Sequence, residues 1–109
     1  MNLDPKIRMT TICAMNGKIM FSDHRSGVVN LLNPEESKKS LEMAVNGWKT
    51  RSQLANKIGK GKYVLAEYEK IKRITMPFGN DHLLYITTEV EADHNKVLEG
   101  IGKLQRALK

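Results

Sequence analysis

Hydrophobic and polar residues alternate near the start of the chain. Over residues 7–15 the apolar side chains fall mainly on one side of a period-two pattern, which is typical of a β-strand. Asn16-Gly17 follows directly, and this dipeptide favours a two-residue hairpin turn, because both central residues of a type I′ turn need a positive φ. Residues 18–22 supply a returning strand, and residues 23–27 end it. The first unit is therefore predicted to be a β-hairpin.

The residues Asn33-Pro34-Glu35-Glu36 predict the start of a helix: Asn33 can cap it, Pro34 suits its first position, and Glu36 can reach back to the cap. We expect this helix to cover residues 34–58. One apolar stripe contains Leu41, Ala44, Val45, Trp48, Ala55 and Ile58, and a second contains Met43, Gly47 and Leu54. Two stripes predict contacts with two different surfaces. Gly47 predicts a close backbone approach or a bend, since glycine costs about 1 kcal/mol inside a helix.

Three strands and a final helix are predicted in the second half of the chain. Gly59-Lys60-Gly61-Lys62 ends the long helix, and strands are expected over residues 63–68, 71–78 and 82–88. Asp93 opens the last helix, whose apolar face contains Val97, Leu98, Ile101, Leu104 and Leu108.

The order of these elements, β-β-α-β-β-β-α, predicts an α+β fold. We expect a single five-stranded antiparallel sheet with helices packed on it. The 109 residues are enough for one domain, residues 1–109, which buries its core without disulfide or metal staples.

Basic residues are concentrated in the middle third of the chain. Residues 38–73 contain ten Lys and Arg residues against three Glu residues, and the formal net charge of the whole chain is +6. A one-sided positive field favours anionic partners such as nucleic acid, acidic lipid or an acidic protein. A solvated basic face that only keeps the protein dissolved accounts for the same pattern.

Few residues suit catalysis or metal binding. Cys13, His24, His82 and His94 are scattered without the spacing of a metal site. Cys13 lies within a predicted strand, where a small buried hydrophobic side chain is expected. Gly59-Lys60-Gly61-Lys62 lacks the spacing of a phosphate-binding loop and follows a helix rather than a strand. We therefore expect no cofactor, no metal and no enzymatic activity.

The lone cysteine also bears on location. A secreted domain of this size usually carries paired cysteines, and no signal peptide is recognisable. The apolar runs are too short to span a membrane. The expected location is the cytoplasm.

Three short segments, taken with the order of the elements, resemble the roadblock/LC7 family, which has a profilin-like five-stranded antiparallel sheet with helices on both faces. They are Leu3-Asp4-Pro5-Lys6-Ile7-Arg8, Asn16-Gly17-Lys18 and Gly79-Asn80-Asp81-His82-Leu83-Leu84. In order and spacing they are similar to an archaeal, mainly thaumarchaeal, group with that fold. Two features depart from the family: the helix before the first strand is missing or reduced to Met1-Asn2-Leu3, and the basic middle third is not general.

The resemblance implies a non-enzymatic protein-interaction module. Roadblock-like proteins form homodimers or heterodimers and act as scaffolds or regulators of small GTPases and motor complexes. In such dimers the third strand and the long helix meet their counterparts across a two-fold axis. We therefore expect this protein to pair with itself or with a related roadblock-like protein, and a small GTPase or another acidic protein is a further expected partner.

The expected dimer interface joins the edge of the third strand to the second apolar stripe of the long helix, because an unpaired strand edge and an uncovered stripe both need a partner. Its residues are Met43, Gly47, Leu54, Tyr63, Leu65 and Glu67. A separate patch for an anionic partner is expected to contain Lys49, Arg51, Lys57, Lys60, Lys62, Lys72 and Arg73.

A small basic nucleic-acid-binding protein is the alternative function. Trp48, Tyr63 and Tyr68 lie among the basic residues, where aromatic rings can stack on bases. Trp48 also belongs to the first apolar stripe, where core packing or an interface explains it. Binding of a nucleic acid through lysines should weaken steeply with salt, which separates the two functions.

Overall fold

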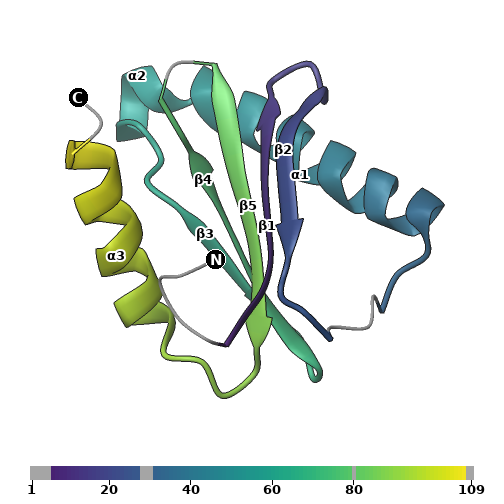
Figure 1. The fold of residues 1–109 in the computed structure, drawn as a ribbon. Coiled ribbons are helices and arrows are strands. Elements are labelled where there is room, and N and C mark those ends of the chain that lie inside the picture. Colours follow the sequence, from purple (N-terminus) through teal and green to yellow (C-terminus); the bar gives the residue numbers. More distant parts are fainter. Residues whose placement is uncertain (1–5, 28–30, 80, 108–109) are drawn as a thin grey trace.

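The computed structural model of the protein describes residues 6–27, 31–79 and 81–107, and Figure 1 shows its arrangement. In chain order the elements are β1 (Ile7–Ala14), β2 (Ile19–His24), α1 (Pro34–Gln53), α2 (Ala55–Ile58), β3 (Val64–Glu67), β4 (Ile71–Pro77), β5 (His82–Glu89) and α3 (His94–Ala107). The motif residues 1–5, Asn80, Leu108 and Lys109 lie outside the described ranges.

The strands form one five-stranded sheet in the order β2-β1-β5-β4-β3. Every neighbouring pair is antiparallel, with Ile12 opposite Leu84 and Thr75 opposite Tyr85. The predicted fold class, a single antiparallel sheet with helices packed on it, is confirmed. The first and last strands of the chain, β1 and β5, pair at the centre of the sheet, so its middle is built from segments far apart in sequence.

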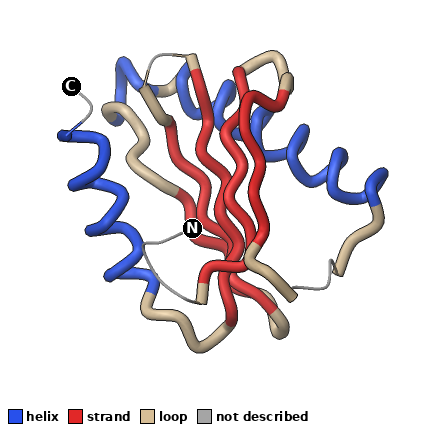
Figure 2. The backbone as a smooth tube through the Cα atoms, viewed as in Figure 1, coloured by secondary structure: helices blue, strands red, loops and turns tan. Residues whose placement is uncertain are grey.

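The two long helices cover opposite faces of this sheet, as the views in Figures 1 and 2 show. The α1 face buries Cys13, Leu41, Val45, Trp48, Leu83 and Tyr85. The α3 face buries Ile7, Ile74, Met76, Leu84, Ile86, Val97 and Ile101. Alternate residues of β5 thus enter different cores, which is why this strand reads as a nearly continuous apolar run rather than as an alternation.

The first hairpin has a different turn from the predicted one. The amide of Ala14 donates to the carbonyl of Lys18 at 2.8 Å, and the amide of Gly17 donates to the carbonyl of Ala14 at 2.9 Å. Gly17 has φ +91°, whereas Asn16 is not among the described residues with positive φ. The loop therefore has three residues and ends in a left-handed glycine, so the type I′ prediction is wrong although the hairpin is correct.

The start of α1 is as predicted, and its end is not. The side chain of Asn33 accepts from the amide of Glu36 at 2.8 Å, and the Glu36 carboxylate accepts from the amide of Asn33 at 3.0 Å. The helix stops at Gln53, Leu54 caps it, and the short α2 follows. Beyond this break Ile58 no longer faces the sheet and is 79% exposed, so its predicted place in the buried stripe is wrong.

Gly47 does not bend α1, which runs without interruption from Pro34 to Gln53. A Cβ atom at Gly47 would meet the end of the Arg51 side chain, at 2.8 Å from Nη1. Since that side chain is long and flexible, the expected close backbone approach is not what holds this glycine in the described structure. The change of direction occurs at Leu54 instead.

The carboxylate of Asp93 caps α3, accepting from the amides of Asn95 and Lys96 at 3.0 and 3.4 Å. Val97 and Ile101 are buried against the sheet as predicted. Leu104 is 45% exposed, which contradicts its predicted place on the buried face. The contact of α3 with the sheet therefore rests mainly on Val97 and Ile101.

A charged cluster ties β1 and the segment after β2 to the end of β5. Oε1 of Glu89 accepts from Arg8 at 2.8 Å and from Arg25 at 2.9 Å. Burial alone raises the pKa of the Glu89 carboxyl, but the hydrogen bonds and charges of Arg25 and Arg8 outweigh it, and the pKa lies below its ordinary value. The cluster therefore favours the ionised carboxylate in the folded state.

This lowered pKa predicts a loss of stability in acid. A carboxyl with a depressed folded pKa contributes stability above its ordinary value of about 4.5, and loses it as the pH falls through the lower folded value. We expect Glu89→Gln to lower the free energy of unfolding by about 1 kcal/mol at pH 7, given partial exposure. Urea unfolding at pH 7 and pH 3 checks this. An equal difference from wild type at both pH values would contradict it.

Candidate interaction surface

The side of α1 turned away from its core carries uncovered apolar side chains. Met43 and Leu54 are exposed, Leu54 by 48%, and Gly47 is half-buried beside them on the helix. We call Met43, Gly47 and Leu54 the outer stripe. Its exposure is what the second apolar stripe predicts when the first one, around Leu41, Val45 and Trp48, fills the core.

The edge strand β3 lies at one end of the sheet and pairs only with β4 within the described residues. Tyr63, just before it, is about half exposed. Leu65 packs toward the α3 core, and Glu67, two residues on, shares its face. The structure therefore places Leu65 and Glu67 on the face opposite α1 and the outer stripe, so the predicted interface residues do not share one face of the sheet.

Trp48 is the side chain that holds the end of α1 on the sheet. It is 3% exposed, and its indole Nε1 donates to Oγ1 of Thr75 at 2.9 Å. A Cβ atom at Gly61 would lie 2.6 Å from Cζ3 of Trp48, so only glycine fits where the chain passes over this ring. The Arg51 guanidinium lies 5.4 Å from the ring centroid. The second glycine of Gly59-Lys60-Gly61-Lys62 thus serves packing.

Five of the seven predicted patch cations are exposed along the second half of α1, α2 and the approach to β3. They are Lys49, Arg51, Lys57, Lys60 and Lys62. We call these five the basic patch. Leu54 and Tyr63 belong to the same stretch of the chain, residues 49–63, so these exposed apolar side chains are flanked in sequence by positive charge.

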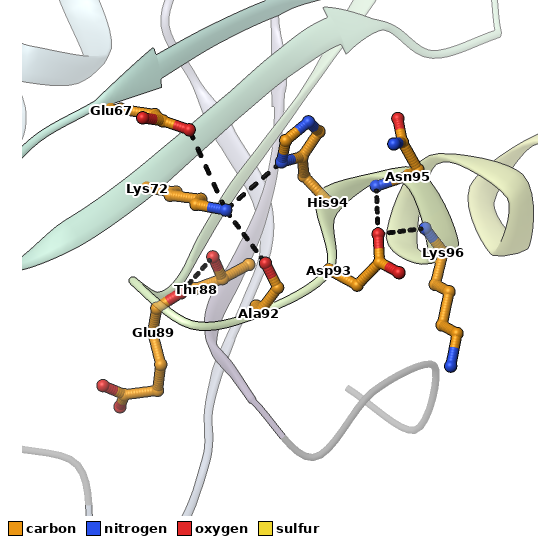
Figure 3. A network of polar contacts seen from close by, with 9 residues as sticks. All are labelled: Glu67, Lys72, Thr88, Glu89, Ala92, Asp93, His94, Asn95 and Lys96. Carbon is orange, nitrogen blue, oxygen red and sulfur yellow. Dashed lines mark hydrogen bonds and ion pairs between the residues drawn. The ribbon is translucent and has the colours of Figure 1, made fainter.

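Lys72 is engaged within the protein on the α3 side of the sheet (Figure 3). Its Nζ donates to the carbonyl of Ala92 at 2.9 Å and lies 3.2 Å from Nδ1 of His94, with the Glu67 carboxylate at 3.9 Å. This network fastens the start of α3 to β3 and β4. Lys72 is therefore a structural cation, largely withdrawn from the surface.

Arg73 points to the opposite face of the same strand. Its Nη1 donates to Oγ of Ser40, whose hydroxyl also contacts the Tyr85 hydroxyl at 2.8 Å. Its guanidinium lies over the rings of Tyr68 and Tyr85, at 5.5 and 5.6 Å from their centroids. Lys72 and Arg73 are adjacent in sequence but separated by the sheet, so the candidate patch for an anionic partner narrows to the basic patch.

Possible metal ligands are not brought together in the described ranges. His, Cys, Asp and Glu residues there do not gather in threes as metal ligands would. Cys13 is fully buried between β1 and α1, and burial raises the pKa of its thiol, so it packs as a hydrophobic side chain, as expected. Of the helices described, none has both the length and the apolar character needed to cross a membrane.

A further surface, which sequence reasoning missed, lies at the other end of the sheet. Between the first half of α1 and strands β1 and β2 there is a groove of about 670 Å³. We call it the α1–β2 groove. Its apolar lining includes Met9, Ile19, Leu31, Leu32, Leu41 and Tyr85. Ile19 is the large apolar residue of β2 that lines it, and this side chain is about half exposed.

Comparisons with known proteins agree on the architecture. No protein-family model matches the sequence, and no curated protein matches it. A roadblock/LC7 domain from Streptomyces avermitilis matches with 15% identity and a TM-score of 0.73, over 95% of this chain and 83% of that one. The gliding protein MglB from Thermus thermophilus matches with 14% identity and a TM-score of 0.76, over 94% and 75%. Profilin IB from Acanthamoeba castellanii matches with 13% identity and a TM-score of 0.56, over 94% and 85%.

The chain has the roadblock/LC7 fold. The resemblance drawn from the order and spacing of the sequence motifs is confirmed at this level, and so is the likeness to profilin. Identities of this size establish a shared fold, in which the sheet order and the two-sided helix packing described above recur.

Proposed function

We propose that this protein is a non-enzymatic interaction module that forms a dimer through β3 and α1. The observation that carries the proposal is that the edge of β3 is open and that the outer stripe of Met43, Gly47 and Leu54 is largely exposed. A two-fold axis near both elements would pair the two β3 edges and cover the two stripes at once, because an isologous contact joins like with like.

Positive charge opposes this contact. Lys49, Arg51 and Lys57 would be doubled near the axis, and like charges repel, although salt screens them beyond ~8 Å. Burial of apolar surface outweighs this repulsion, because a standard interface covers ~1,600 Å² and charges at its rim cost little. A further MglB structure with the same fold is described as having a tetrameric arrangement, which is consistent with association of such domains.

The proposal extends to the partners. A related roadblock-like protein replaces the second copy in a heterodimer, and the basic patch suits a small GTPase or another acidic protein that docks on the assembled module. The archaeal, mainly thaumarchaeal, affiliation and the cytoplasmic location stay predictions of the sequence.

Light scattering tests the dimer. We expect a molar mass about twice 12.4 kDa at micromolar concentration, and a fall toward the monomer in Leu54→Glu, because a buried unpaired carboxylate costs several kcal/mol. Leu104→Glu on α3 is the matched control, since the two leucines are 48% and 45% exposed. A monomer at every concentration and salt would exclude the homodimer and leave the heterodimer.

Nucleic-acid binding remains the alternative, favoured by the basic patch with the exposed Tyr63. Two of its three candidate stacking rings are already occupied: Trp48 is in the core, and Arg73 lies against Tyr68. A salt titration with DNA and RNA separates the two functions, since several phosphate contacts make affinity fall steeply with salt. Tight, salt-sensitive binding to either polymer would favour the alternative.

A further inference from the structure

The edge strand β2 has a free hydrogen-bonding side. The amide of Arg25 donates to the carbonyl of Arg8 at 2.9 Å, which makes these two residues a hydrogen-bonded pair of the β1–β2 ladder. Such pairs alternate in an antiparallel ladder, so the backbone groups of Ser22 and His24 point away from β1. Within the described residues no strand lies beyond β2. Its outer side is therefore a template for another strand.

The α1–β2 groove lies on one face of the same edge. The side chains of Ser22 and His24 line it, together with the apolar side chains of Leu31 and Leu32. In an antiparallel pair, residues directly opposite each other project to the same face. A residue added opposite Ser22 would hydrogen-bond to its backbone and place its own side chain in the groove. The residue next to it would project to the other face, beside Phe21.

The charged residues around the groove indicate which residues a bound ligand should carry at its two ends. Lys18 precedes β2 and Lys38 stands on the α1 wall of the groove, and both are exposed. Arg8 also lines the groove but is paired with Glu89, and Glu42 is the carboxylate of the lining. Lys18 and Lys38 are therefore the cations that acidic residues at the two ends of a ligand would meet.

We propose that β2 and the α1–β2 groove bind an extended peptide segment of a partner, which adds a strand to the sheet, places apolar side chains in the groove at alternate positions and carries acidic residues at its flanks. A small apolar molecule would fill the groove but leave the edge amides unpaired, whereas a peptide backbone satisfies both. This site lies at the opposite end of the sheet from β3, so it goes beyond the proposed dimer and does not depend on it.

The side chain of Asp23 partly covers the open edge of β2 in the absence of a partner. Its Oδ1 accepts from the amide of His24 at 3.0 Å, which covers one of the two outward donors. A charged side chain on an edge strand discourages unselective pairing between copies. The uncovered amide of Ser22 is thus the donor on which binding depends most.

The test uses a fluorescein-labelled peptide with valine at alternate positions, threonine between them and glutamates at both ends. Ser22→Pro removes the outward amide without breaking a β1 hydrogen bond, and Ser22→Ala removes only the side chain, which contacts Thr11. We expect Ser22→Pro to bind about tenfold more weakly than Ser22→Ala in fluorescence anisotropy. Equal affinities would overturn strand addition.

Two further binding measurements test strand addition if Ser22→Pro fails to fold. The same peptide, N-methylated at the amides that would face β2, should lose at least about tenfold in affinity for the wild-type protein. Lys38→Glu should weaken binding severalfold, whereas Lys39→Glu, the neighbouring exposed lysine outside the groove lining, should not. Unchanged binding of the N-methylated peptide, or no binding of the parent peptide at millimolar concentration, would overturn the proposal. Light scattering of the same samples reports the β3 dimer separately.

Discussion

Trp48→Ala is expected to lower the free energy of unfolding by about 3–5 kcal/mol, the range for removing a large buried aromatic side chain. The indole is 3% exposed and anchors α1 to Thr75, and the chain at Gly61 packs directly on its ring. Its removal leaves a cavity between helix, sheet and loop. Since the free energy of unfolding of such a domain is about 5–15 kcal/mol, the variant loses much of its stability.

Urea unfolding monitored by circular dichroism measures this effect. Tryptophan fluorescence is not suitable, because Trp48 is the sole tryptophan and is absent from the variant. Trp48→Phe is the matched control. It keeps most of the packing and removes the hydrogen bond to Thr75, so a loss of about 1–2 kcal/mol is expected. Equal losses in the two variants would show that the hydrogen bond, rather than the ring volume, holds α1 in place.

Ile101→Ala is expected to cost about 2–5 kcal/mol, as for other isoleucines in a packed core. Ile101 is fully buried between α3 and the sheet, in the cluster with Ile74 and Ile86. Leu104→Ala, one turn later on the same face of α3 but 45% exposed, should change stability by less than about 0.5 kcal/mol. Similar losses in both variants, measured by urea unfolding, would contradict the exposure of Leu104 at the end of the contact between α3 and the sheet.

The fold could be predicted from the sequence because its local signals agree with its long-range contacts. Asn33 and Glu36 specify the start of α1 through their own hydrogen bonds, and turn residues separate the strands. The turn type was missed because Asn-Gly suits two hairpin geometries, and the protein uses the one in which Gly17 alone has a positive φ. The end of α1 was missed because the helical period continues to Ile58 although the helix breaks at Leu54.

The candidate site was less predictable, because a side chain's partners come from distant elements. From the sequence, Lys72 and Arg73 were predicted to be exposed surface cations, because they lie in a basic segment. Their partners, His94 with Ala92 and Ser40 with Tyr85, come from α3, α1 and β5, and no local pattern connects them. The outer stripe, in contrast, followed from helical period alone, and Met43 and Leu54 are exposed as that period implies.

Because β2 and β3 lie at opposite ends of the sheet, a dimer formed through β3 would have two open β2 binding sites. A dimer joined through β3 would carry its two β2 edges at the far ends of a ten-stranded sheet, roughly 40 Å apart at ~4.8 Å per strand. One partner chain with two suitable segments on a long enough linker would then bind both ends, and the second contact would form at a high effective concentration. Two strand contacts that are weak individually would thus give tight bivalent binding, and this gain in affinity would be lost when the dimer separates.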